Sequence, residues 1–195
     1  MSLRFTITII LMLPLVGLAM PAWADFRAGM DAYDRGDYAT ALREIRPLAE
    51  QGDANAQGLL GVLYDNGRGV PQDSVQARQW YEKSAAQGFA AAQGNLGSMY
   101  YTGEGVPQDY QQALRWLRLV ADQGDALGQV KLGLMYEQGK GVPQDYVQAH
   151  KWYNLWAANG EKLGVEARDA LAKQMTPTQI AEAQKLAREW KPKIP

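Results

Sequence analysis

The stretch from residue 73 to residue 88 carries its apolar side chains at the spacing of one helix face. Small and aromatic residues recur at positions i, i+3, i+4, i+7 and i+8, namely Ala77, Trp80, Tyr81, Ser84 and Ala85. This spacing predicts an amphipathic helix with one buried stripe. A second apolar pattern follows and predicts another helix over about 90–101, with inward-facing Ala92, Leu96, Met99 and Tyr100.

This helix pair is the unit of an internal repeat. The segment Gly-Val-Pro-Gln-Asp occurs at 69–73, 105–109 and 141–145, at a constant spacing of 36 residues. One helix pair cannot bury its apolar stripe alone, whereas stacked pairs form a continuous core. The sequence therefore predicts an all-α fold, an α/α superhelix (solenoid) of stacked antiparallel helix pairs with a 36-residue repeat.

Local signals mark where the predicted helices begin and end. Asp73 is followed three residues later by Gln76, which predicts an N-cap with a capping box, and Asp109 and Asp145 open the later units in the same way. Gly88 and its repeats should end the first helix of each unit at a position that needs a positive φ.

Two features inside the predicted helices need a packing reason. Gly61, Gly97 and Gly133 lie within the second helix of each unit, where glycine costs about 1 kcal/mol relative to alanine. We expect a close backbone approach there, against the small Ala77-type position of a neighbouring helix. Pro47 falls inside the first helix of the opening unit, where it predicts a kink or a late start.

Residues 1–24 have the pattern of an export signal. A short n-region with one positive charge, Arg4, precedes an apolar stretch, and Ala22 and Ala24 supply the small residues of a cleavage site. The apolar stretch is shorter than the ~20 residues of a membrane span and contains Pro14. We therefore expect cleavage after Ala24, no membrane span afterwards, and a periplasmic or secreted protein.

The remaining chain divides into a repeat region and a cap. We expect the solenoid over 25–160, with an opening helix at 26–34, one divergent unit and three clear units. Capping helices should fill 161–195, and Thr176 followed by proline predicts the start of the last one.

The repeat motif resembles that of a known family. Each unit reads A-x-x-W-Y-x-x-A-A-x-Q-G, then A-x-A-Q-x-x-L-G-x-x-Y, then G-x-G-V-P-Q-D, from residue 37 to about residue 160. This pattern is similar to the Sel1-like repeat (SLR), which is related to the tetratricopeptide repeats. The resemblance implies an α-solenoid whose curved surface binds other proteins, and bacterial members often act as exported adaptors.

Composition excludes several classes of function. Lys+Arg 20 against Asp+Glu 21 gives a formal net charge of −1, without the basic excess that is typical of nucleic-acid binding. The sequence has no cysteine, which excludes disulfides, zinc–thiolate sites and thiol nucleophiles. His150 is the single histidine, and the serines lie in no nucleophile motif. We expect no catalytic residue, no metal site, no cofactor and no nucleic-acid partner.

Positions that vary between units indicate where a partner could bind. Opposite the buried stripe, the predicted first helices carry a basic strip of Arg43, Arg46, Arg115, Arg118 and Lys151. The same face also carries Gln79, Glu82 and Asn154, and it should lie on the concave side of the solenoid. Two interpretations remain open, a groove for an acidic peptide or protein edge and a merely solvated helix face. Trp156 is added to this partner-binding set because it is the one aromatic residue that the repeat does not require.

These features favour a non-enzymatic protein–protein interaction module or adaptor in the bacterial periplasm, with a protein partner. An alternative is a scaffold associated with the cell wall or with polysaccharide, in which Trp156 would stack on sugar rings. A third possibility follows from the resemblance alone. Cysteine-rich relatives are associated with binding or hydrolysing β-lactams, but they are held by disulfides and this chain has no cysteine.

Overall fold

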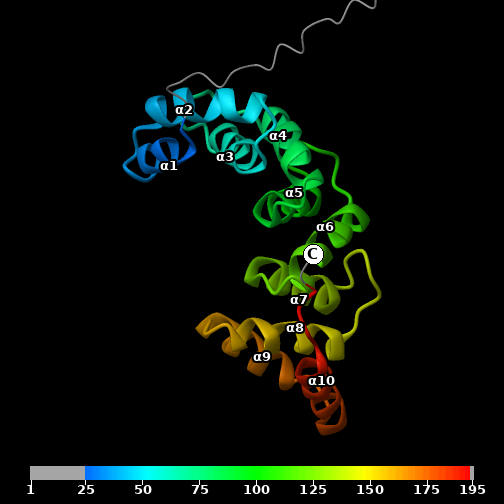
Figure 1. Cartoon of the computed structure of the whole chain (residues 1–195). Coiled ribbons are helices and arrows are strands. Elements are labelled where there is room, and N and C mark those ends of the chain that lie inside the picture. Colours follow the sequence, from blue (N-terminus) through cyan, green and yellow to red (C-terminus); the bar gives the residue numbers. More distant parts are fainter. Residues whose placement is uncertain (1–24, 194–195) are drawn as a thin grey trace, which may run out of the picture.

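The computed structural model describes residues 25–193, which form ten α-helices with no β-strand among them. The predicted signal peptide, residues 1–24, lies outside the described residues. In chain order the helices are α1 (Phe26–Asp34), α2 (Tyr38–Glu50), α3 (Ala54–Asp65), α4 (Ser74–Ala86), α5 (Ala90–Thr102), α6 (Tyr110–Asp122), α7 (Ala126–Gln138), α8 (Tyr146–Ala158), α9 (Lys162–Ala172) and α10 (Pro177–Glu189). They follow one another around an arc (Figure 1).

Consecutive helices pack as antiparallel pairs, and each pair stacks on the next. α2 pairs with α3, α4 with α5, α6 with α7 and α8 with α9, while α1 packs on α2 and α10 packs on α8. This arrangement confirms the predicted α-solenoid of 36-residue helix pairs. The expected boundary near residue 160 falls in the turn between α8 and α9, and the division into solenoid and cap stays a prediction.

The arc has an inner and an outer side. In Figure 1, α2 and α4 run along the outer side of the arc, and α3 and α5 lie on its inner side. α3 and α5 also touch each other, although α4 separates them in the sequence. Curvature brings the inner helices together, so the second helices of the pairs line the hollow.

The N-caps form as predicted, but the capping box does not. The Asp73 carboxylate accepts a hydrogen bond from the backbone N–H of Gln76 at 3.0 Å. The backbone N–H of Asp73 donates instead to the carbonyl oxygen of Tyr64 at 2.9 Å, and Asp109 and Asp145 repeat this contact one and two units later. This bond ties each first helix to the second helix before it. The turns within the pairs contain the predicted positive-φ glycines, Gly88, Gly124 and Gly160.

The glycines inside the second helices have a different neighbour from the one expected. A Cβ atom at Gly61 would lie 2.6 Å from the ring of Tyr81, and one at Gly97 would lie 2.8 Å from Cγ of Leu117. The space is therefore filled by a large side chain of the following helix, not by close contact with Ala77. Because these rings and branched chains are buried, they cannot move aside for a methyl group.

Two further predictions concern the burial of the apolar stripe and the effect of the proline in α2. Ala77 and Tyr81 are buried as expected, and Trp152 is 0% exposed, whereas Trp80 is only partly buried. α2 starts at Tyr38 and continues through Pro47 to Glu50, so the predicted late start does not occur.

The C-terminal helix closes the core of the last units. Thr176 and Gln179 form a complete capping box at the start of α10, which confirms its predicted beginning. The helix buries Ala183 and Ala187 against α8. After α10 the chain turns back past α8 toward α6 (Figure 1), and its Lys193 reaches Asp122 at the end of α6.

A surface of repeated pockets on the first helices

The basic strip lies on the first helices of the pairs, and these form the outer layer of the arc. α2 and α4, which carry Arg43, Arg46, Gln79 and Glu82, run along its outer side in Figure 1. The concave placement expected from the sequence is therefore wrong for these helices. The physical reason is the contact between α3 and α5, because the layer whose helices approach each other must be the inner one.

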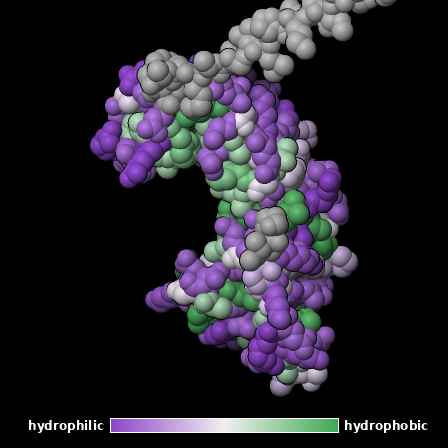
Figure 2. Space-filling view, viewed as in Figure 1, coloured by the Kyte–Doolittle hydropathy of each residue, from purple (hydrophilic) through white to green (hydrophobic). Residues whose placement is uncertain are grey.

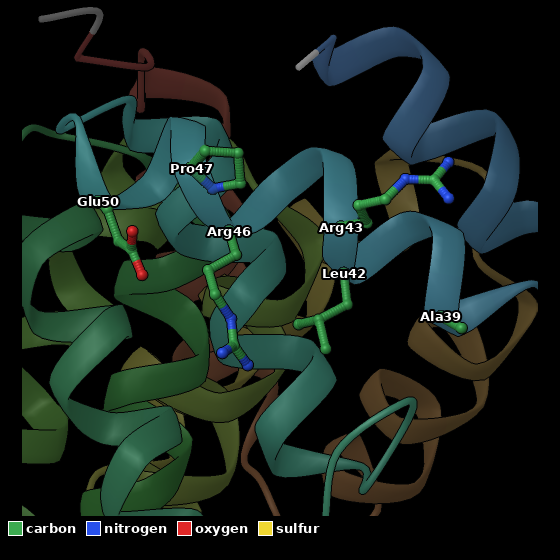
Figure 3. A pocket seen from close by; sticks show the side chains of 6 residues that line it. All are labelled: Ala39, Leu42, Arg43, Arg46, Pro47 and Glu50. Atoms are coloured by element: carbon green, nitrogen blue, oxygen red, sulfur yellow. The ribbon is translucent and has the colours of Figure 1, made fainter. Parts of the chain in front are cut away.

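One pocket of about 410 Å³ opens on α2. Its lining residues are Ala39, Leu42, Arg43, Arg46, Pro47 and Glu50 (Figure 3). Figure 3 shows the side chains of Arg43 and Arg46 extending away from each other. Arg43 pairs with the buried carboxylate of Glu44 at 3.1 Å, and Arg46 donates to the hydroxyl of Tyr64 at 3.4 Å. The pocket therefore has an apolar floor and two guanidinium groups. That of Arg43 is held in an ion pair, and that of Arg46 is more available to a partner.

A second pocket, of about 440 Å³, opens on α6. Its lining residues are Leu114, Arg115, Trp116, Arg118 and Leu119. Arg115 is exposed, while Arg118 lies 3.6 Å from the Asp122 carboxylate and donates to the hydroxyl of Tyr136 at 3.2 Å. The two pockets occupy the same repeat position, because residues 41–46 read Ala-Leu-Arg-Glu-Ile-Arg and residues 113–118 read Ala-Leu-Arg-Trp-Leu-Arg.

The unit between these pockets is different. On α4, Glu82 forms an ion pair with Arg78 at 2.7 Å, and Lys83 places its ammonium group 3.9 Å from the centre of the Trp80 ring. Gln79 is exposed and carries no charge. The basic strip is thus interrupted at α4, and the two arginine pockets alternate with a unit whose charges are satisfied internally.

The three remaining candidates are all on α8, and of these only Lys151 lies near a pocket arginine, because it shares the Trp152 ring with Arg118. The Lys151 ammonium lies 4.3 Å from the centre of the Trp152 ring, and its pKa is lowered by burial and by the nearby Arg118. Asn154 accepts a hydrogen bond from Arg168 of α9 at 3.4 Å. Trp156 packs with Tyr153, with ring centres 6.5 Å apart, and belongs to the core between α7 and α9.

Sequence reasoning missed the apolar residues that line the pockets. Leu42 and Pro47 on α2 correspond to Leu114 and Leu119 on α6, two repeats later. Comparing units at a spacing of two repeats, rather than one, would have revealed them. A third pocket, of about 360 Å³, lies between α1, α3 and α5. Its apolar lining includes Phe26, Met30, Leu59, Val62 and Phe89, and Figure 2 shows hydrophobic surface along the hollow of the arc.

Within the described chain, no three His, Cys, Asp or Glu side chains are close enough to hold a metal ion. His150 is 2% exposed, and burial lowers its pKa, with the guanidinium of Arg168 acting in the same direction. None of the ten helices between residues 25 and 193 has the length and apolar character to cross a membrane.

The Sel1 repeat family matches this chain over residues 54–89, 90–125 and 126–161. The chain therefore belongs to the Sel1 repeat family, as its motifs indicated. Each matched unit joins the second helix of one pair to the first helix of the next. Sel1 repeats generally serve as protein-interaction modules, and the fold is typically a non-catalytic scaffold.

Solved structures share the fold. A Sel1 repeat protein from Oxalobacter formigenes is similar with a TM-score of 0.72 and 30% sequence identity, over 85% of this chain and 70% of that one. The protein c5321, a protective antigen of uropathogenic Escherichia coli strains with an SLR fold, is similar with a TM-score of 0.59 and 32% identity. That similarity covers 85% of this chain and 44% of the antigen. No curated protein sequence matches the chain.

Proposed function

We propose that this protein is a non-enzymatic interaction module of the bacterial periplasm, which binds a protein partner along the outer face of its first helices. The observation that carries the proposal is the recurrence of one pocket type on α2 and α6. Each copy combines exposed arginine with an apolar floor, formed by Leu42 and Pro47 in one and by Leu114 and Leu119 in the other. Apolar side chains grouped beside exposed arginine favour an interaction surface over a merely solvated helix face.

The chemistry of the two pockets favours a partner segment with acidic side chains next to apolar ones. Arginine presents a planar fork that matches a carboxylate, and the apolar floor releases water when a partner covers it. Arg46 and Arg115 are the arginines to test. Arg43 pairs with the buried Glu44, so changing it would also leave that carboxylate without its partner. Arg118 pairs with Asp122, which also holds Lys193, so changing it would disturb that contact as well.

The test is cross-linking capture in the periplasm with tagged mature protein, residues 25–195. The variant Arg46→Glu with Arg115→Glu reverses both charges, and Arg27→Glu with Lys173→Glu is a control with the same change in net charge at exposed positions elsewhere. We expect one partner that is captured by wild type and by the control but lost from the strip variant, with circular dichroism showing that the strip variant is folded. Equal capture by all three proteins would reject this surface.

Export is tested separately from binding. The periplasmic fraction should contain protein whose N-terminus is Asp25, and its intact mass measures this directly. Retention of residues 1–24 on the isolated protein would reject cleavage after Ala24 and with it the proposed location.

A further inference from the structure

The chain binds its own C-terminal segment at one junction between first helices. At the α6–α8 junction, the Trp190 ring packs edge-to-face on Trp152, with ring centres 6.3 Å apart. Three residues later, Lys193 places its ammonium group 2.9 Å from the Asp122 carboxylate, and its backbone N–H donates to the carbonyl oxygen of Asp122 at 2.6 Å. Pro192 lies over the turn at Gly124. An aromatic group and a cation three positions apart are thus held by a tryptophan and a carboxylate.

The α2–α4 junction contains the same receptor groups two repeats earlier. Trp80 corresponds to Trp152, Glu50 to Asp122 and Gly52 to Gly124, each at a spacing of 72 residues. The turns are braced in the same way, because Gln87 donates to the carbonyl oxygen of Gly52 at 3.0 Å and Asn159 donates to that of Gly124 at 3.5 Å. The intervening α4–α6 junction has Ala86 at the carboxylate position and lacks this pair.

Within the described residues, the α2–α4 copy is uncovered. A Cβ atom at Gly52 would meet no described heavy atom within 4 Å, whereas one at Gly124 would meet Trp190 at 3.7 Å and Pro192 at 3.9 Å. Glu50 is exposed, while the side chain of Asp122 is only 16% exposed under Lys193. The two junctions therefore share receptor groups and differ in occupancy.

We infer that the α2–α4 junction binds a segment of a partner protein that carries an aromatic residue followed, three positions later, by lysine or arginine. The aromatic ring would pack on Trp80, the cation would pair with Glu50, and a backbone N–H would reach the Glu50 carbonyl oxygen. The occupied α6–α8 junction is the template for each of these contacts. The inference rests on the proposed function in that the segment belongs to a protein partner, and Glu50 also lines the α2 pocket. It concerns contacts with Trp80 and Glu50, whereas the proposed function is tested at Arg46 and Arg115.

One side chain must move for the segment to bind. Lys83 lies over the Trp80 ring, and it is exposed and flexible enough to swing into solvent. At the occupied junction the corresponding residue is the uncharged Leu155, and Trp190 packs on Trp152 although the Lys151 ammonium also lies 4.3 Å from the centre of that ring. Replacing Lys83 with leucine should therefore strengthen binding of the segment at the α2–α4 junction.

The probe is the chain's own segment as a fluorescent peptide of residues 188–193, Arg-Glu-Trp-Lys-Pro-Lys, titrated into the full mature protein by anisotropy. We expect saturable binding that is about tenfold weaker for Glu50→Lys, because a charge-assisted contact is replaced by repulsion. Trp80→Ala should weaken binding as well. Glu104→Lys, which alters an exposed acidic residue away from the junction, is the matched control and should bind as wild type.

Four outcomes would overturn the inference. The first is an absence of saturable binding, and the second is equal binding by wild type and Glu50→Lys. The third is loss of binding in Asp122→Lys but not in Glu50→Lys. The fourth is self-association of the protein that is abolished by deleting residues 190–195. The third would mean that the peptide only exchanges with the chain's own segment, and the fourth that a second copy is the occupant. None of them changes the capture result for Arg46→Glu with Arg115→Glu, so the failure of this inference and of the proposed function are distinguishable.

Discussion

Replacing Gly61 with alanine sets two opposing effects against each other in the middle of α3. Alanine is favoured over glycine by about 1 kcal/mol in a helix interior, so propensity alone predicts a more stable protein. The added Cβ would lie 2.6 Å from two ring carbons of Tyr81, well inside the normal contact distance. Packing therefore predicts the opposite sign.

The packing effect should be the larger one. Adding a methyl group to a filled core costs about 1–3 kcal/mol. Tyr81 is 1% exposed and its hydroxyl donates to the Asp65 carboxylate at 3.3 Å, so the ring cannot swing away without losing both burial and this bond. After subtraction of the propensity gain, we expect Gly61→Ala to lower the free energy of unfolding by up to about 2 kcal/mol.

Urea unfolding followed by circular dichroism measures the effect, with thermal unfolding as a second reading at about 2–4 °C per kcal/mol. Gly94→Ala in α5 is the matched control. There the nearest atom to an added Cβ is the end of the Leu127 side chain at 3.3 Å, and Leu127 is 39% exposed and can shift. This variant should be more stable than wild type, by up to about 1 kcal/mol. A Gly61→Ala protein that is more stable than wild type, as Gly94→Ala should be, would refute the packing argument.

Three further sets of substitutions test other parts of the structure. Burial lowers the pKa of His150 from 6.5, and the guanidinium of Arg168 acts in the same direction, so the imidazole takes up a proton more readily in the unfolded chain. The free energy of unfolding measured in urea should therefore fall as the pH drops below 6.5, and His150→Leu should flatten that dependence. Trp152→Ala should cost about 3–5 kcal/mol, and Trp80→Ala at the same repeat position clearly less, because Trp80 is only partly buried. Equal losses would contradict that difference in burial. Asp109→Ala should cost about 1 kcal/mol by removing the N-cap of α6, and Asp109→Asn should restore most of it in the same unfolding assay.

Local chemistry made much of the fold predictable. The 36-residue period, the aspartate caps and the turn glycines each act within a few residues of chain, so the helix pairs and their order follow from the sequence. The start of α10 was predictable for the same reason, because Thr176 and Gln179 satisfy each other across one helical turn.

The capping boxes predicted at the starts of α4, α6 and α8 do not form, because the backbone N–H of each N-cap aspartate donates to a tyrosine carbonyl oxygen of the preceding helix. The carbonyl oxygen of Tyr64 takes the N–H of Asp73, and this contact exists only after α3 and α4 have packed together. The neighbours of Gly61 were missed for a similar reason. The repeat spacing indicated that space was needed, but which side chain of the next helix would fill it depends on the packing angle between helices.

The candidate surface shows the same division. The sequence by itself determined which residues lie opposite the buried stripe, because helical periodicity assigns each residue to a face. Only the tertiary structure decided that α2 and α4 lie on the outer side of the arc and that α4 interrupts the basic strip with its own ion pair. It also decided that Trp190 and Lys193 cover the α6–α8 junction, whereas the α2–α4 junction at Trp80 is uncovered within the described residues. Curvature and long-range contacts depend on how successive helices pack, and no local spacing in the sequence encodes that angle.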